Sequence, residues 1–285
     1  MPATRPEIQD HARASGEAAA LALDDVSLVY TRGLFRAHTS VLQRVSLRVP
    51  AGARIGLIGP NGSGKSSLLR IAAGIQRQTS GCASAFGYPL EDERARERIG
   101  FLSDGSPFPP ELSARYVLEL FHRLHRLDRR PPREAGGGVR AQRRKYCDAL
   151  LERAGLSSDA HRPLGTFSRG MLRRFGLAQA FLHEPDLVLL DEPTAGLDAP
   201  GHTVLETFLA EAQARGAALL LASHIPSDLL AFTDHVAVLV EGTITRQGPP
   251  ETLLAQAGRG MAALFNTHAS NEEVDEDQNI PGNSA

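Results

Sequence analysis

The sequence predicts an α/β domain with a mostly parallel sheet, an N-terminal antiparallel β region and an inserted α-helical subdomain. Short apolar runs such as ARIGLIG (53–59), DLVLL (186–190) and ALLLAS (218–223) have the length and composition of strands that are buried on both faces. Segments with helical patterning lie between these runs. Buried strands that alternate with helices are typical of a parallel sheet.

The other elements follow along the chain. LALDDVSLVY (21–30) and VLQRVSLRV (41–49) read as half-buried strands. The prolines and glycines of RRPPREAGGG (129–138) stop a helix and predict a loop. Helices are expected over 65–73, 111–127, 141–154 and around 201–215, with one more after the stretch 166–175 that ends at about 183, and a last pair of strands is expected near 235–247.

The helical block over about 105–180 interrupts the alternation, so we expect it to form a subdomain within one domain that spans 20–268. Residues 1–19 are polar and alanine-rich without periodicity, and residues 269–285 carry five acids and no base. Such composition cannot bury enough apolar surface to fold, so both ends are predicted to be disordered tails.

Composition excludes several classes of protein. The chain has 285 residues, 42% of them hydrophobic, and a formal net charge of −2, which argues against broad nucleic-acid binding. Cys82 and Cys147 have no CxxC spacing, so neither a disulfide framework nor a structural zinc site is expected, and a reducing cytoplasm fits. No apolar run approaches the roughly 20 residues that span a bilayer, and no apolar signal core follows the N-terminal charges.

Lysine is scarce in this chain. It holds 29 arginines and only two lysines, Lys65 and Lys145. Where such a chain keeps a lysine, we expect that a compact ammonium group is required.

The segment GPNGSGKSS (59–67) fits the phosphate-binding pattern GxxxxGK[ST] and lies directly between a predicted strand and a predicted helix. Backbone amides of such a loop point at a phosphate, the lysine reaches the β and γ oxygens, and the hydroxyl ligates magnesium. A chance glycine-rich turn is the less favoured alternative. The residues expected to bind the nucleotide are Gly59, Pro60, Asn61, Gly62, Ser63, Gly64, Lys65, Ser66 and Ser67.

LVLLDE (187–192) places two carboxylates at the end of a buried strand, where ligands of parallel sheets bind. Asp191 is expected to hold Mg²⁺ together with Ser66. Glu192 is expected to orient and polarise the attacking water as general base. The alternative is that the two acids only cap a strand at a polar turn.

A phosphate loop with a strand-end acid occurs in kinases, GTPases, helicases and transport motors. Over residues 21 to about 254, however, the chain resembles the ATP-binding subunits of ATP-binding-cassette (ABC) transporters, closest in motif style to drug and ABC-2 type exporters. FSRGM (167–171) resembles the family signature, of which Ser168 and Gly170 are kept. The resemblance implies that these two residues face the ATP of a partner subunit. Arg169 departs from the consensus and either attracts the triphosphate or points to solvent.

The resemblance also assigns roles to residues outside the phosphate loop. PTAGLD (193–198) resembles the family's D-loop, so Asp198 would link the two ATP sites, and LLLASH (219–224) ends on His224, which would contact the γ-phosphate. Tyr30 matches the aromatic that stacks on adenine, although an isolated tyrosine is more often a core residue. Asp104 stands where the family has a glutamine, and as a carboxylate it can still ligate magnesium.

The resemblance implies an ATPase that needs ATP and Mg²⁺, closes as a homodimer or heterodimer, and powers transport through a separate membrane permease at the cytoplasmic face of a bacterial membrane. Nine basic residues against two acids in 122–145 indicate either a solvated face or contact with lipid headgroups or permease loops. The alternatives are a non-transport ABC ATPase of DNA repair or ribosome function and a pure binding module, against which Glu192 and His224 argue.

Overall fold

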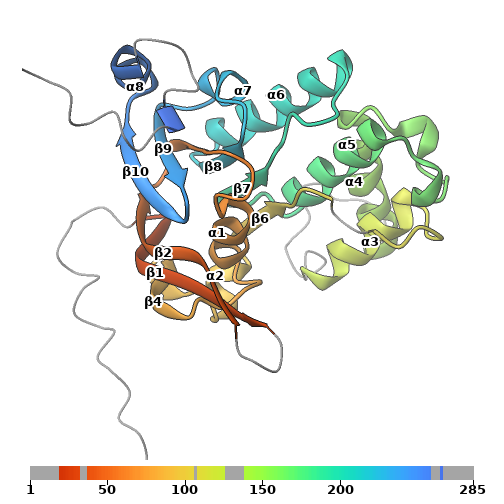
Figure 1. Cartoon of the computed structure of the whole chain (residues 1–285). Helices are drawn as coiled ribbons and strands as arrows, with labels where there is room; N and C mark the ends of the chain where they lie inside the picture. The colour runs from red at the N-terminus through yellow and green to blue at the C-terminus, as the bar shows by residue number, and fades with distance from the viewer. Residues whose placement is uncertain (1–18, 33–36, 106–107, 126–137, 258–263, 266–285) are drawn as a thin grey trace, which may run out of the picture.

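The computed structural model describes residues 19–32, 37–105, 108–125, 138–257 and 264–265 (Figure 1). The tails predicted over 1–19 and 269–285 lie outside these residues, except for residue 19. Most of the predicted loop over 129–138 and the middle of the basic segment over 122–145 also lie outside them.

A six-stranded sheet forms the centre of the fold, with the strand order β10-β9-β3-β8-β7-β6. β9 and β10 pair antiparallel, and all the other neighbours pair parallel. Every residue of β7 and of β8 is buried, as their apolar runs predict. The mostly parallel sheet is therefore confirmed, with strands β3 (Arg54–Ile58), β6 (Ile99–Leu102), β7 (Leu187–Asp191), β8 (Ala218–Ser223), β9 (His235–Val240) and β10 (Thr243–Gly248).

A second, antiparallel sheet with the order β2-β1-β4-β5 confirms the expected N-terminal β region. Two of its strands were not predicted, because SGCASA over 80–85 is small and polar and because the last strand has only two residues. The strands are β1 (Leu21–Arg32), β2 (Ala37–Val49), β4 (Ser80–Ala85) and β5 (Tyr88–Pro89).

Three helices gather into a subdomain of their own. In Figure 1, α1 lies at the centre beside the sheets, whereas α3, α4 and α5 pack together on the right side of the molecule as the expected helical subdomain. α3 begins at Ala114 because the Ser113 hydroxyl caps it by accepting the Tyr116 N–H. The helices are α1 (Lys65–Ala72), α2 (Glu93–Arg96), α3 (Ala114–Leu124), α4 (Val139–Arg153), α5 (Arg169–Phe181), α6 (Ala199–Ala214), α7 (Ser227–Leu230) and α8 (Pro250–Ala257), with 3₁₀ turns at Ser157–Asp159 and Leu164–Thr166.

Two hydrophobic cores cover the two faces of the central sheet. Leu187 and Leu189 of β7 pack in the core that includes α1 and the antiparallel sheet. Val188 and Leu190, which point the other way, pack in the core that includes α3, α4, α5 and α6. This alternation follows from the period of two along a strand. It explains why both faces of β7 must be apolar.

The parallel pairing brings the carboxyl ends of β3, β6, β7 and β8 to one edge of the sheet. The phosphate loop follows β3, Asp104 follows β6, Glu192 follows β7 and His224 follows β8. Residues from four distant parts of the sequence therefore meet at this edge, which is where ligands of such sheets bind.

Candidate functional site

The loop between β3 and α1 has the geometry of a phosphate cradle. Gly64 has φ 106°, in the left-handed region that favours glycine, and a Cβ at Gly59 would lie 2.1 Å from the carbonyl oxygen of Leu239. Gly64 is the N-cap of α1 and carries no side chain to occupy the first-turn N–H groups. These donors and the positive end of the helix dipole are therefore open toward an anion.

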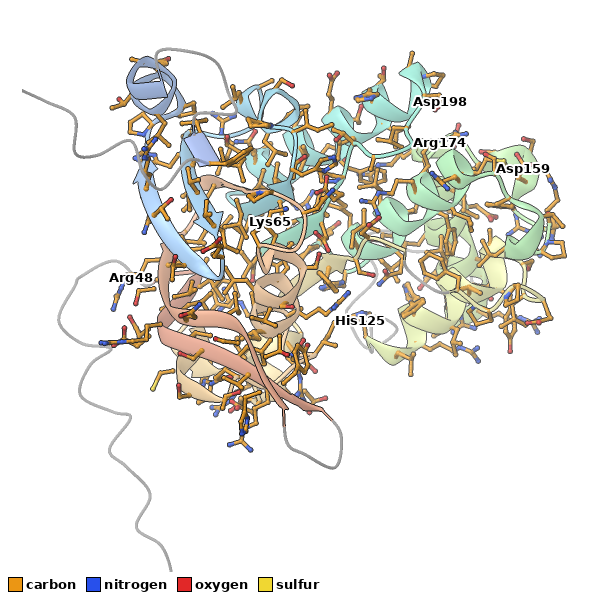
Figure 2. The ribbon with its side chains drawn as sticks, in the orientation of Figure 1. Arg48, Lys65, His125, Asp159, Arg174 and Asp198 are labelled. Carbon is orange, nitrogen blue, oxygen red and sulfur yellow. The ribbon has the colours of Figure 1, made fainter. Side chains whose placement is uncertain are left out.

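Lys65 is held at the mouth of this loop. Its Nζ donates to the carbonyl oxygens of Gly59 at 2.7 Å and Pro60 at 3.0 Å, and only 6% of the residue is exposed. Burial lowers the pKa of Lys65, while the charges of Glu192 and Asp191 oppose this shift. Figure 2 shows Lys65, the first residue of α1, in the middle of the molecule. The ammonium group is thus placed before a ligand arrives.

A cavity of about 470 Å³ opens over the loop, which is large enough for a small-molecule ligand. It joins the phosphate loop to the ends of β6, β7 and β8. Six predicted residues of the loop and three predicted residues from elsewhere line it, and Val41 and Ala195 were not predicted. The lining residues are Val41, Asn61, Gly62, Gly64, Lys65, Ser66, Ser67, Asp104, Glu192, Ala195 and His224.

Asp191 is a buried carboxylate at the end of β7, directly before the cavity-lining Glu192. It is 1% exposed, and neither of its side-chain oxygens has a hydrogen-bond partner within normal geometry. Burial raises its pKa, and the charge of Glu192 adds to this, whereas the nearby Ser66 hydroxyl and Asp104 backbone N–H lower it without forming complete hydrogen bonds. A buried carboxylate whose hydrogen bonds are incomplete is stabilised by a positive partner.

The oxygen donors at this point fit a divalent cation. Ser66 and Asp104 line the same cavity, and both act on the pKa of Asp191, whose two oxygens have no complete hydrogen bond. Mg²⁺ prefers hydroxyl and carboxylate oxygens, together with water and phosphate. The residues present therefore fit the predicted magnesium site.

Glu192 is held tightly beside the cavity. Its Oε1 lies 2.9 Å from both the backbone N and Nδ1 of His224, and its Oε2 accepts from the Ser223 hydroxyl at 3.1 Å. Its backbone has φ 50°, in the left-handed region that L-residues seldom adopt and that is common at functional sites. The carboxylate can take a proton from a water molecule in the cavity.

Sequence reasoning did not identify Ser223 or Arg173 as part of this arrangement. Ser223 lies directly before His224, so its place in ALLLASH was the only available signal. Arg173 of α5 is buried and donates to the carbonyl oxygens of Ser103, Asp191 and Glu192. No local pattern reports such a tertiary contact.

The remaining predicted residues lie outside the cavity lining. Ser63 and the loop residues Gly59 and Pro60 belong to the phosphate loop but do not line its cavity. Tyr30 is 40% exposed, and its hydroxyl accepts from Gln76 Nε2 at 2.6 Å. The stacking role of Tyr30 therefore stays a prediction.

The signature residues lie at the N-terminus of α5. The Ser168 hydroxyl caps the helix by accepting the Met171 N–H at 3.2 Å, and a Cβ at Gly170 would lie 3.3 Å from the Gly196 carbonyl oxygen. Asp198 caps α6 by accepting the Gly201 N–H at 3.0 Å, and Figure 2 shows it far from Lys65. Their predicted roles concern a partner subunit and stay predictions.

Arg169 lies against the D-loop of its own chain. A Cβ at Gly196 would approach its side-chain carbons to 2.9 and 3.3 Å. The signature stretch and the D-loop are thus in contact within one subunit.

Within the described part of the chain, none of the helices has the length and apolar character needed to span a bilayer.

Comparisons with known proteins point in one direction. The family described as "ABC transporter" matches residues 42–195. The ABC transporter ATP-binding protein YdbJ of Bacillus subtilis is 36% identical over 72% of this chain. The daunorubicin resistance ATP-binding protein DrrA3 of Streptomyces coeruleorubidus is 33% identical over 76%, and the Nod factor export ATP-binding protein I of Neorhizobium galegae is 32% identical over 85%. The matched segment spans 63% of the first relative and 66% of each of the other two, slightly less than two thirds of their length.

Solved structures agree with these matches. The ATP-binding subunit of an ABC transporter superposes with a TM-score of 0.71 at 27% identity and covers 84% of this chain and 93% of its own. A structure described as a dimeric bacterial ABC transporter cassette, MJ0796, superposes with a TM-score of 0.70 at 25% identity and covers 80% of this chain and 98% of its own.

Proposed function

Because this chain belongs to the ABC transporter family, we propose that it is the ATP-hydrolysing subunit of an exporter, and that ATP-driven closure of a dimer powers transport through a separate permease. The observation that carries this proposal is the cavity at the edge of the sheet. Lys65, Ser66, Asp104, Glu192 and His224 line it together although they come from four parts of the sequence.

The proposed chemistry is in-line attack of water on the γ-phosphate of ATP. The open N–H groups at the start of α1 bind the phosphate oxygens, and Lys65 moves from its two loop carbonyls to the β and γ oxygens. Glu192 accepts a proton from the attacking water, and His224 holds the Glu192 carboxylate in place. Positioning and charge neutralisation carry the catalysis.

Mg²⁺, when bound by Ser66, Asp191 and Asp104, would neutralise charge on the phosphate oxygens. Asp191 is the strongest candidate among these ligands, because both of its buried oxygens lack hydrogen-bond partners. Asp104 would supply a negative charge where a neutral amide is the more common residue of the family.

The dimer is proposed to be head-to-tail, so that Ser168 and Gly170 of one subunit close the ATP site of the other. The comparison that supports a dimer is the MJ0796 cassette, which is described as dimeric. The Ser168 hydroxyl now caps α5, and the helix N-terminus beside it would complete the site electrostatically.

The permease is proposed to dock between the sheet and the helical subdomain, which would hold the subunit at the cytoplasmic face of the membrane. A hollow of about 320 Å³ lies there, lined on one side by Ile75, Ile99 and Phe101 and on the other by Phe108, Phe121 and His125. Ser103 also lines it, and the next residue, Asp104, lines the ATP cavity. The names of the drug-resistance and Nod factor relatives support export.

Two measurements test the proposed function. Purified protein should release phosphate from ATP in the presence of Mg²⁺, and Lys65→Met should abolish this release. The Glu192→Gln variant, trapped with ATP, should capture a polytopic membrane protein from detergent-solubilised membranes of the source cells. ATPase activity combined with capture of ribosomes or DNA would favour the non-transport alternative, and ATP binding without phosphate release would favour a pure binding module.

A further inference from the structure

Arg173 is a buried arginine on the signature helix that the proposed chemistry does not use. It lies on α5, past Ser168 toward the middle of the helix, and only 7% of the residue is exposed. Arginine is seldom buried without partners, because its charge loses solvation there. The partners of this guanidinium therefore indicate what it does.

The partners are main-chain carbonyls at the ends of two neighbouring strands. Nη1 donates to the carbonyl oxygen of Ser103 at 3.0 Å, directly after β6. Nη2 donates to the carbonyl oxygens of Asp191 and Glu192, at the end of β7. β6 and β7 pair in parallel up to Leu102 and Leu190, so the guanidinium joins the two strands just where their regular pairing stops.

The guanidinium stays charged in this buried position. Burial lowers the pKa of Arg173, and the carboxylate charges of Asp104, Asp191 and Glu192 oppose this, Asp104 most strongly. Arginine still stays protonated at physiological pH. Asp104, the acid that departs from the family pattern, directly follows Ser103, whose carbonyl oxygen accepts from Arg173.

We propose that Arg173 is a positioning residue that holds Asp104 and Glu192 in register across the ends of β6 and β7. The catalytic part of this inference rests on the proposed ATPase function. The hydrogen bonds by which Arg173 joins the ends of β6 and β7, called the clamp below, exist without any ligand. The planar guanidinium suits this role, because it places several donors in one fixed plane.

Arg174, the next residue of α5, provides a matched control. Its Nη1 donates to the carbonyl oxygens of Ala154 at 3.1 Å and Gly155 at 2.9 Å, after the end of α4. It also anchors α5 through main-chain carbonyls, but within the described part of the chain it donates no side-chain hydrogen bond to the ends of β6 or β7. Figure 2 shows Arg174 on the side of the helical subdomain.

The first experiment measures hydrogen–deuterium exchange in the protein without nucleotide, comparing wild type, Arg173→Met and Arg174→Met. Arg173→Met should raise exchange in peptides that cover 99–104 and 187–192, and Arg174→Met should raise it only around 154–155. Equal exchange of the β6 and β7 peptides in wild type and Arg173→Met would overturn the clamp. This readout does not depend on ATP hydrolysis, so it separates failure of the inference from failure of the proposed function.

The second experiment measures steady-state ATPase activity. Arg173→Met should lower kcat by about 10- to 100-fold, as loss of residues that orient a catalytic group commonly does, with a smaller change in KM for ATP. Arg174→Met should stay within about twofold of wild type. Arg173→Lys keeps the positive charge but loses the planar set of donors, so its kcat should lie between those of wild type and Arg173→Met. If Arg173→Met does not fold, Arg173→Lys takes its place in the comparison. A Lys or Met variant with wild-type kcat would contradict the positioning role.

Discussion

Oε1 of Glu192 lies 2.9 Å from both the backbone N and Nδ1 of His224, so one carboxylate oxygen is held by two groups of a single residue. The other oxygen accepts from the Ser223 hydroxyl. The loop that follows β8 thus fixes the orientation of the acid that follows β7. A substitution in either loop is therefore expected to shift the position of the Glu192 carboxylate in the cavity.

His224→Ala should disturb the orientation of the Glu192 carboxylate without disturbing nucleotide binding. The backbone N–H at position 224 still donates to Glu192, but the imidazole contact is lost, so the carboxylate gains freedom. We expect kcat to fall by roughly 10- to 100-fold with a small change in nucleotide affinity. Steady-state kinetics and nucleotide titration measure the two effects, and a His224→Ala variant with wild-type kcat would remove His224 from the catalytic arrangement.

Asp191→Asn should stabilise the protein without nucleotide while it removes Mg²⁺-dependent activity. Burial raises the folded-state pKa of Asp191 above its ordinary value of 3.8. The folded state therefore keeps a proton that the unfolded chain loses, and stability from this group is lost as the pH rises through the folded pKa. At pH 7 the variant should melt higher than wild type, by roughly 2–4 °C for each kcal/mol gained.

Melting curves over pH give the control for this prediction. The difference between Asp191→Asn and wild type should shrink as the pH falls through the folded-state pKa and below the ordinary value of 3.8, where the carboxylate is protonated in both states. Added Mg²⁺ with ATP should stabilise wild type only. A variant that melts lower than wild type at pH 7 would mean that the Asp191 charge is already compensated in the protein without ligand.

Asp104→Gln should change the magnesium requirement. The substitution restores the common residue of the family and removes one negative charge from the cavity. We expect half-maximal ATPase activity to need roughly tenfold more Mg²⁺, because a carboxylate binds the cation more strongly than an amide. If both the ATPase rate and its Mg²⁺ dependence stay unchanged, Asp104 is not a ligand.

Ser168 offers a test of the cross-subunit role, because its helix cap and its proposed role at the partner's ATP site respond differently to substitution. Ser168→Ala loses the helix cap and should cost about 1 kcal/mol of stability. Ser168→Asp restores the cap, but its carboxylate would repel a triphosphate. The Asp variant should therefore melt like wild type and yet fail to form an ATP-dependent dimer on size exclusion, whereas a normal dimer would exclude Ser168 from the partner's site.

The sequence predicted those parts of the fold whose cause is local. β3, β7 and β8 carry continuous apolar runs because both of their faces are buried, and α1 follows directly from the phosphate loop. β4 was missed because its small polar residues carry no strand signal, and IGFL of β6 was not assigned as a strand. These strands exist because their neighbours β1 and β7 offer them a pairing partner.

The same distinction holds for the candidate site. Lys65, Ser66, Asp104, Glu192 and His224 could be named from motifs, and the structure brings all five to one cavity. The contacts made by Arg173 join α5 to residues 70 and 18 or 19 positions away, so no local pattern reports them. Tyr30 and Asp198 carry motif-based roles that need a bound nucleotide or a second subunit to test.

We propose that Glu192 activates water in an ATP site built on Lys65. The most direct measurement is single-turnover phosphate release with ATP and Mg²⁺, compared between wild type and Glu192→Gln, with nucleotide retention measured on the same samples. Glu192→Gln should keep ATP bound, form an ATP-stabilised dimer and release phosphate at least about 100-fold more slowly than wild type. Equal rates of phosphate release in the two proteins would contradict the account.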